Sequence, residues 1–267
     1  MRKLVLSVVL VGVLSLSFVA VAAQSTQVDV TPGDMQGWVF AVESGTGTGA
    51  LVNGPDTPPI GAGSANLTVP NGAGGVVLAV AAFQGTPLAD MTNLEYSTYR
   101  ASGGPALAIA LQFNIDFDLA DGVDTFQGRM VYEPYHSGTP VLTGVWQTWN
   151  PQDNAPLGNW WFNRAPGNSV CPQSNPCTWQ EVLTAFPNAG IHADLGAVIL
   201  KAGSGWSTGF DGNVDALTIG VNGMDTTYNF EAAPTDKDQC KNGGWAAFSD
   251  PSFMNQGQCI KFVNTGK

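Results

Sequence analysis

Apolar and polar residues alternate in short runs along most of the chain. In ALQFNIDFDL, residues 110–119, five apolar side chains alternate with Gln, Asn and two Asp. A period of two predicts a strand with one buried and one wet face. Similar runs, separated by clusters of Gly, Pro, Asn and Asp, predict strands within residues 37–44, 64–69, 76–83, 94–102, 106–118, 128–137, 145–149, 159–163, 196–203, 215–223 and 226–231.

One segment breaks the alternation. In PCTWQEVLTAF, residues 176–186, Thr178 can cap a helix and Glu181, three residues later, can complete a capping box. Apolar residues at helical spacing follow, and Pro187 ends the run. The segment predicts one short helix packed over the strands. The composition agrees with a mostly β-protein, because 33 Gly, 17 Pro and only 12% charged residues favour tight turns over exposed helices.

The two ends of the chain differ from its centre. Arg2 and Lys3 precede an apolar run and small residues at 20, 22 and 23, which predicts a cleaved secretory signal peptide at residues 1–23. We expect no membrane span in the mature chain. A β-sandwich domain at residues 24–231 and a linker at 232–239 would then precede a small C-terminal motif at 240–267.

Four cysteines in an exported chain are expected to pair. Four cysteines allow three connectivities, and the local one joins Cys171 to Cys177 and Cys240 to Cys259. The second pair would close the C-terminal motif, which is too small to fold without it. The motif could then be docked on the sandwich or mobile.

The charge excludes some partners. The formal charge is −11, and it becomes −13 when Arg2 and Lys3 leave with the signal peptide. Such an acidic protein is not expected to bind nucleic acid or anionic membrane surfaces.

Four of the eight tryptophans lie in residues 143–164, TGVWQTWNPQDNAPLGNWWFNR. Trp146 and Trp149 are three residues apart and Trp160 and Trp161 are adjacent, so each pair should split between the two faces of a strand. If the two runs form a hairpin, an outward pair of indoles could stack on sugar rings, with Arg164 among the nearby polar groups. Alternatively, the predicted helix or the C-terminal motif covers the outer pair.

Acidic residues suggest a calcium site. NIDFDLADGVD places Asp116, Asp118, Asp121 and Asp124 at a strand end and in the following turn, where hard oxygen ligands suit Ca²⁺. The alternative is a solvated turn in which Asp is a turn former. In FDGNVDALTIG, residues 211–213 are expected to form a tight turn before a strand that starts at Asp215.

Catalytic patterns are scarce. The five glutamates show no spacing that would place an acid and a nucleophile on one strand face. Glu133 is the best single candidate for an acid, although a hydrogen-bonded Glu at a strand end is the simpler interpretation. Two histidines offer little material for a triad or a metal site.

FDGNVDALTIG and the YNFE that follows resemble the last-strand pattern of concanavalin A-like jelly rolls, the laminin-G and lectin/glucanase group. The resemblance implies an all-β, two-sheet antiparallel jelly-roll sandwich, frequent glycan binding and a structural Ca²⁺ to which Asp215 would correspond. The catalytic carboxylates of the glucanase members have no match here. The chain also resembles exported bacterial proteins that end in a CKNGGW-type tail, a likeness that implies no activity.

The hypothesis from the sequence is therefore a secreted, non-enzymatic β-sandwich that binds polysaccharide. Two alternatives remain. One is a structural protein of the cell envelope or matrix whose tryptophans only pack. The other is a glycoside hydrolase or lyase with dispersed carboxylates.

Overall fold

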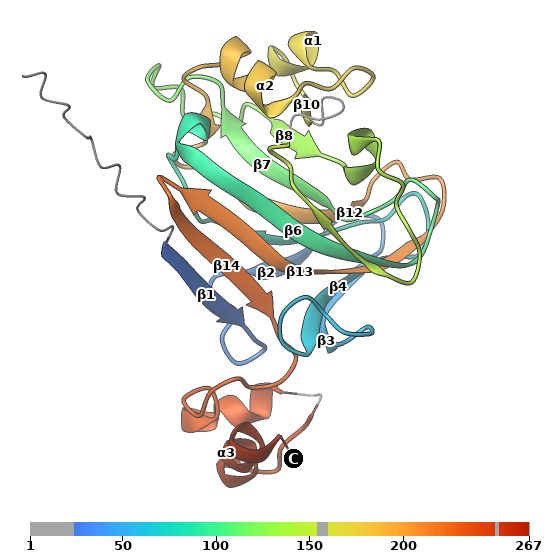
Figure 1. The fold of residues 1–267 in the computed structure, drawn as a ribbon, viewed down its shortest axis with the longest axis vertical. Coiled ribbons are helices and arrows are strands. Elements are labelled where there is room, and N and C mark those ends of the chain that lie inside the picture. The colour runs from blue at the N-terminus through green and yellow to red at the C-terminus, as the bar shows by residue number, and fades with distance from the viewer. Residues whose placement is uncertain (1–23, 154–159, 249–250, 267) are drawn as a thin grey trace, which may run out of the picture.

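Each of the alternating runs contains a strand in the computed structural model, which describes residues 24–153, 160–248 and 251–266. The strands form two seven-stranded sheets that face each other as a sandwich (Figure 1). The predicted fold class is confirmed. The predicted signal peptide, residues 1–23, lies outside the described residues, and no helix within them is long and apolar enough to cross a membrane.

The first sheet is built around its longest strands and is called the β13 sheet. Its members are β1 (Gln24–Val30), β3 (Thr48–Asn53), β4 (Gly63–Val69), β6 (Met91–Ser102), β9 (Trp146–Trp149), β13 (Phe210–Val221) and β14 (Met224–Phe230). All pairs are antiparallel except that of β1 with β14.

The second sheet is called the β7 sheet. Its members are β2 (Val39–Ser44), β5 (Gly75–Val80), β7 (Ala110–Asp116), β8 (Arg129–Tyr132), β10 (Trp160–Phe162), β11 (Gly190–Ile191) and β12 (Val198–Gly203). Six of them run in the order β10-β8-β7-β12-β5-β2, and β11 pairs with β7.

The tryptophan runs do not form the hairpin suggested by their closeness in sequence. β9 pairs with β6 in the β13 sheet, whereas β10 pairs with β8 in the β7 sheet. The hairpin interpretation is wrong because the two strands belong to different sheets. The split of each pair across its own strand is nevertheless found, since Trp149 and Trp160 are buried and Trp146 and Trp161 are partly exposed.

β13 forks the sheet to which it belongs. Its first half pairs with β4 and its second half with β14, while β6 runs along the opposite edge. The two halves meet at a bulge where Ala216 has φ +55°. Residues 211–213 are therefore inside a strand, and the expected turn there is wrong. The hairpin turn instead falls at Asn222 and Gly223, which both have positive φ.

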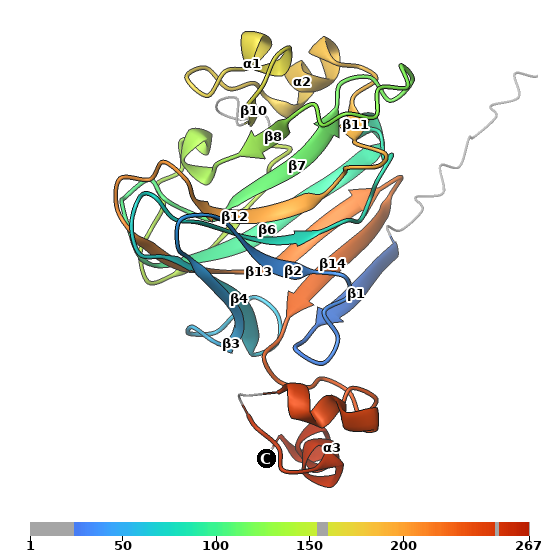
Figure 2. The ribbon, with the colours of Figure 1, turned by 180° about the vertical axis from the view of Figure 1, so that it is seen from behind.

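α1 (Gly167–Val170) and α2 (Trp179–Ala185) lie together at one end of the sandwich, whereas α3 (Gln256–Thr265) lies beyond its other end, as both views show (Figures 1 and 2). The predicted helix is α2 (Trp179–Ala185), and Thr178 and Glu181 form its capping box. Trp179 packs on Trp160 with ring centroids 5.5 Å apart. The described residues hold more helices than the one predicted: α1 (Gly167–Val170), α3 (Gln256–Thr265) and the 3₁₀ turns Leu88–Asp90, Pro134–Ser137 and Lys241–Ala247.

Both predicted disulfides are present, Cys171–Cys177 beside α1 and Cys240–Cys259 in the C-terminal motif. The motif has its own small apolar cluster, which includes the disulfide and Phe248. The motif is docked on the sandwich, because the Phe248 ring lies against Gly33 so closely that a Cβ there would come within 3.0 Å of it.

Candidate functional site

The β7 sheet has one face in the core and one outer face, and the alternation of its strands decides which side chains lie on each. Along β7, Leu111, Phe113 and Ile115 are fully buried between the sheets. Gln112 points to the opposite side, and the strand registers place it beside Val131 of β8, which is itself beside Trp161 of β10. Across the outer face, the indole of Trp161, the side chain of Val131 and the amide of Gln112 therefore lie in one row.

This outer face carries a groove of about 530 Å³. Three aromatic residues line it, and they come from separate segments: Trp161 of β10, Tyr135 of the turn after β8, and Trp206 of the loop after β12. Hydrogen-bonding groups lie between and around them: Gln112, Arg129, Glu133, Asn163, Gln173 and Lys201. An apolar wall with a few placed polar groups is the usual composition of a ligand site.

The indole of Trp161 is held at its edge. Its Nε1 donates to Oε2 of Glu133 at 3.0 Å, and the side chain of Gln173 donates to the same oxygen at 3.0 Å. Burial raises the pKa of Glu133, while these two donors oppose the shift. Because the hydrogen bond uses the ring edge, it fixes the orientation of the indole without occupying the ring face.

The rings of the other two aromatic residues, Trp206 and Tyr135, also contact neighbouring rings. The ring of Trp206 packs edge-on against Phe210 at 4.9 Å between centroids. Tyr135 is 37% exposed and its ring lies 4.0 Å from that of His136. Burial lowers the pKa of His136, which favours the neutral imidazole.

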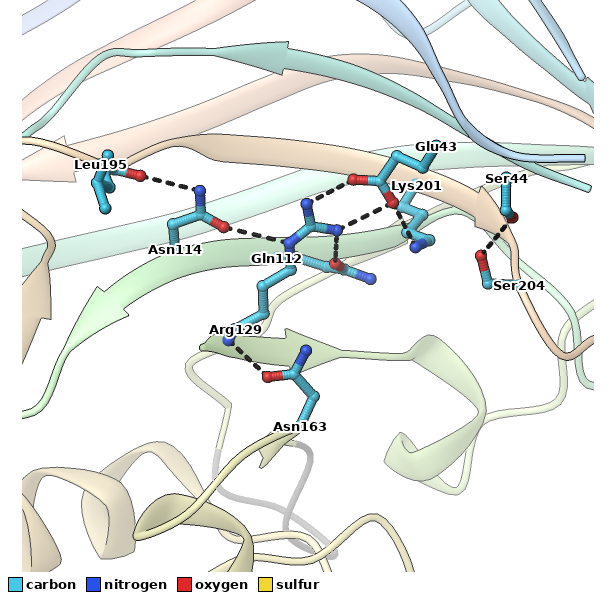
Figure 3. A network of polar contacts seen from close by, with 9 residues as sticks. All are labelled: Glu43, Ser44, Gln112, Asn114, Arg129, Asn163, Leu195, Lys201 and Ser204. Carbon is cyan, nitrogen blue, oxygen red and sulfur yellow. Dashed lines mark hydrogen bonds and ion pairs between the residues drawn. The ribbon is translucent and has the colours of Figure 1, made fainter. Parts of the chain in front are cut away.

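A charged network borders the groove (Figure 3). Glu43 of β2 receives hydrogen bonds from both Nη atoms of Arg129 and from Nζ of Lys201, the shortest at 2.5 Å. Partial burial on its own would raise the pKa of Glu43, but the hydrogen bonds and charges of Arg129 and Lys201 outweigh it and lower the pKa to about 2. Glu43 is therefore ionised at all ordinary pH values.

The reach of this network shows that the face is curved. In the sheet, β2 and β8 are separated by β5, β12 and β7. Neighbouring strands lie about 4.8 Å apart, so four steps would amount to roughly 19 Å on a flat sheet. Glu43 and Arg129 could not touch across that span unless the sheet were strongly twisted and curved. Curvature of this kind makes a concave face.

The structure separates the four predicted tryptophans. Trp161 lies in the groove. Trp146 lies on the β13 sheet, where its Nε1 donates to the carbonyl of Pro55 at 2.9 Å and its ring lies 5.7 Å from that of Tyr99. Trp149 is 3% exposed and Trp160 is 0% exposed. These two cannot stack on a ligand, and their prediction as ligand-binding residues is wrong because both side chains belong to the core.

Arg164, the fifth predicted ligand-binding residue, is exposed two residues after β10. Its guanidinium lies 4.9 Å from the centre of the Phe126 ring. The preceding residue, Asn163, lines the groove.

The predicted calcium ligands have other contacts. Oδ1 of Asp116, Asp118 and Asp121 each accepts the backbone N–H two residues further on, which is the bond of an Asx turn. Asp124 is exposed. At the fork of the β13 sheet, Asp215 accepts the N–H of Phe230 at 3.0 Å and that of Ile60 at 3.2 Å. In the described ranges, no three acidic, His or Cys side chains are grouped to hold a metal ion.

The sequence analysis missed Lys201 and Trp206, which line the groove, and Glu43, which borders it. Glu43 and Lys201 are 158 residues apart, and no local pattern links them. Gln112 had a usable signal, because its place in an alternating run assigns it to the wet face.

Comparisons with known proteins give fold likenesses only. No family model matches the sequence, and no curated protein matches it. A family 11 carbohydrate-binding module of the cellulosomal cellulase Lic26A-Cel5E of Clostridium thermocellum is similar at 11% identity over 69% of this chain and 88% of that chain, with a TM-score of 0.39.

Two further solved structures are similar. The enzymatically active domain of bacteriophage CBA120 tailspike protein 4 has 9% identity over 71% of this chain and 20% of that chain, with a TM-score of 0.35. A structure described as a CBM4 has 16% identity over 71% of this chain and 98% of that chain, with a TM-score of 0.27.

Proposed function

We propose that this chain is a secreted, non-enzymatic β-sandwich that binds polysaccharide in the groove on the outer face of the β7 sheet. The observation that supports the proposal is the indole of Trp161, which lines the groove and is fixed at its edge by Glu133. A sugar ring presents an apolar face for stacking and hydroxyls at its rim for hydrogen bonds. Gln112, Asn163 and Gln173 supply amide groups for those hydroxyls.

The lining favours binding over cleavage. Glycoside cleavage by the common mechanisms uses two carboxyl groups that flank the scissile bond. Among the described residues that line the groove, Glu133 is the only carboxylic acid. Its Oε2 already accepts from Trp161 and Gln173, so it also orients the lining.

The proposal of secretion is supported by sequence chemistry. The first residues have the charged, apolar and small-residue sections of a signal peptide. All four cysteines form disulfides, which persist in oxidising compartments. Export would bring the groove into contact with extracellular polysaccharides.

Binding to a polysaccharide panel tests the proposal, with Trp161→Ala as the decisive variant. Affinity electrophoresis on soluble glucans, xylans, mannans and pectins, and pull-down on insoluble cellulose and chitin, would cover neutral and acidic polymers. Covering one indole face removes roughly 80 Å² from water, worth about 2 kcal/mol, so Trp161→Ala should weaken binding about thirtyfold.

Trp146→Ala is the matched variant, because Trp146 is also a partly exposed tryptophan but lies on the other sheet. We expect its binding to equal that of the wild type. Loss of binding in Trp146→Ala with retention in Trp161→Ala would move the site to the β13 sheet. Absence of binding to every polymer would refute the proposed function.

A further inference from the structure

Basic residues are rare in the sandwich, and their placement is uneven. Residues 24–231 contain only four Lys or Arg: Arg100, Arg129, Arg164 and Lys201. Arg100 is 7% exposed and donates to the carbonyls of Val141 and Gly104 and to the hydroxyl of Thr143, so its role is structural. Of the other three, Arg129 and Lys201 both line the groove.

The two groove cations share one carboxylate. Four of the five N–H donors of Arg129 have partners: Nε bonds Asn114, Nη1 bonds Glu43 and Gln112, and Nη2 bonds Glu43. Glu43 therefore balances Arg129 in a two-point contact of the kind that guanidinium and carboxylate favour.

Lys201 differs from Arg129 in this respect. An ammonium group has three N–H donors. In the described part of the chain, Glu43 is its hydrogen-bond partner, at 2.5 Å, which leaves donors for a ligand. With two cations and one carboxylate in the network, one positive charge is not balanced within it.

The surroundings of Lys201 leave room for an anionic group. The residue opposite it on β7 is Ala110, which also lines the groove and has a short side chain. The hydroxyl-bearing Ser204 and Ser207 line the same groove from the loop after β12. A carboxylate on a sugar ring that lies over Ala110 would meet an ammonium with free donors.

We propose that the groove takes an acidic polysaccharide, one that contains uronic acid, and that Lys201 binds the sugar carboxylate. This inference rests on the proposed function, since it assigns the ligand class of the same groove. It is compatible with the acidic net charge, because a polymer of this class carries at most one carboxylate per sugar, far more sparsely than DNA with one charge per about 1.7 Å.

Matched polymers test the proposal with the full chain. Polygalacturonate, alginate and hyaluronan would each be compared with the same polymer after reduction of its carboxyl groups to alcohols, which keeps length and linkage. We expect at least one acidic polymer to bind, and its reduced form to bind about tenfold more weakly, the usual effect of losing a charge-assisted hydrogen bond.

Substitutions test whether Lys201 is the residue that binds the sugar carboxylate. Lys201→Gln should lower the affinity for the acidic polymer about tenfold and leave the affinity for the reduced polymer unchanged. Lys201→Arg, which keeps the charge, should retain binding and shows that the fold tolerates change at this position. Glu43→Gln, which removes the competing carboxylate, should raise the affinity for the acidic polymer roughly threefold. Lys261→Gln, on the exposed face of α3, is the control and should match the wild type.

The outcomes separate the two proposals. Equal binding of acidic and reduced polymers, or binding of neutral polymers alone, would overturn the acidic-ligand inference and leave the groove as a polysaccharide site. Undiminished binding of the acidic polymer by Lys201→Gln would also overturn it. A protein that binds no polymer, neutral or acidic, would overturn the proposed function itself.

Discussion

Two adjacent tryptophans on β10 should respond in opposite ways to truncation. Trp160 points into the core, where its ring stacks on Phe113 at 5.5 Å and 20° and its Nε1 donates to the carbonyl of Pro151 at 2.7 Å. Trp161 points outward into the groove. Trp160→Ala is therefore a test of stability, and Trp161→Ala is a test of binding.

The expected magnitudes follow from burial. Trp160 is 0% exposed, and an indole buries roughly 200 Å², which corresponds to about 5 kcal/mol at 25 cal/mol per Å². Measured truncations of buried Trp to Ala cost about 3 to 5 kcal/mol. Trp161→Ala removes less buried surface and one hydrogen bond, so about 1 kcal/mol is expected.

Urea denaturation followed by circular dichroism gives both free energies of unfolding. The two variants remove the same side chain from neighbouring positions, so each controls for the other. A cost below about 2 kcal/mol for Trp160→Ala would contradict its place in the core. Equal costs for the two variants would contradict the assignment of opposite faces, and with it the groove.

Two further predictions concern carboxylates. Burial raises the pKa of Asp215 to about 7 from the ordinary value of 3.8, so the folded state holds its proton more tightly than the unfolded chain. The free energy of unfolding should therefore fall by as much as about 4 kcal/mol between pH 4 and pH 7, and Asp215→Asn should flatten this part of the profile in urea titrations; an unchanged slope would refute the cause. Calcium at Asp116, Asp118, Asp121 and Asp124 remains a prediction. Bound Ca²⁺ would make EDTA lower the melting temperature, whereas Asx turns alone would leave it unchanged.

Local patterns in the sequence were enough to predict most of the described strands and their faces, although β1, β3 and β11 were missed. The split of Trp160 and Trp161 follows from geometry alone, because neighbouring residues in a strand point to opposite sides. The capping box of α2 is equally local, since Thr178 and Glu181 contact each other within one turn. Both disulfides join cysteines that are close in sequence, at separations of 6 and 19 residues.

Strand neighbours were not predictable by the same reasoning. Period-two alternation specifies which face of a strand is buried but not which strand lies beside it. β9 and β10 are close in sequence, and a hairpin was the simplest connection. They pair instead with β6 and β8, in different sheets, so the four indoles never form one platform.

The fork in β13 gives Asp215 a structural role that the sequence analysis did not predict. The Gly- and Asn-rich neighbours of Asp215 favour a turn when only local sequence is considered, and its role as a metal ligand was implied only by the resemblance. In the structure, β4 and β14 separate at this position, and the backbone N–H groups of Ile60 and Phe230 need acceptors there. A buried N–H without a partner is costly, so the carboxylate takes the place of the missing strand partner.

The groove depends on the same kind of distant contact. Glu43 lies on the edge strand β2, whose residues are mostly exposed, 86 residues before Arg129 and 158 before Lys201. Its position becomes meaningful only when the β7 sheet curves and brings β2 toward β8. Because Arg129 uses four of its five N–H donors on Glu43, Asn114 and Gln112, whereas Lys201 uses one of three on Glu43, Lys201 is the cation that we propose to meet a ligand. The proposed selectivity of the groove therefore depends on the edge strand β2 as much as on the strands that line it.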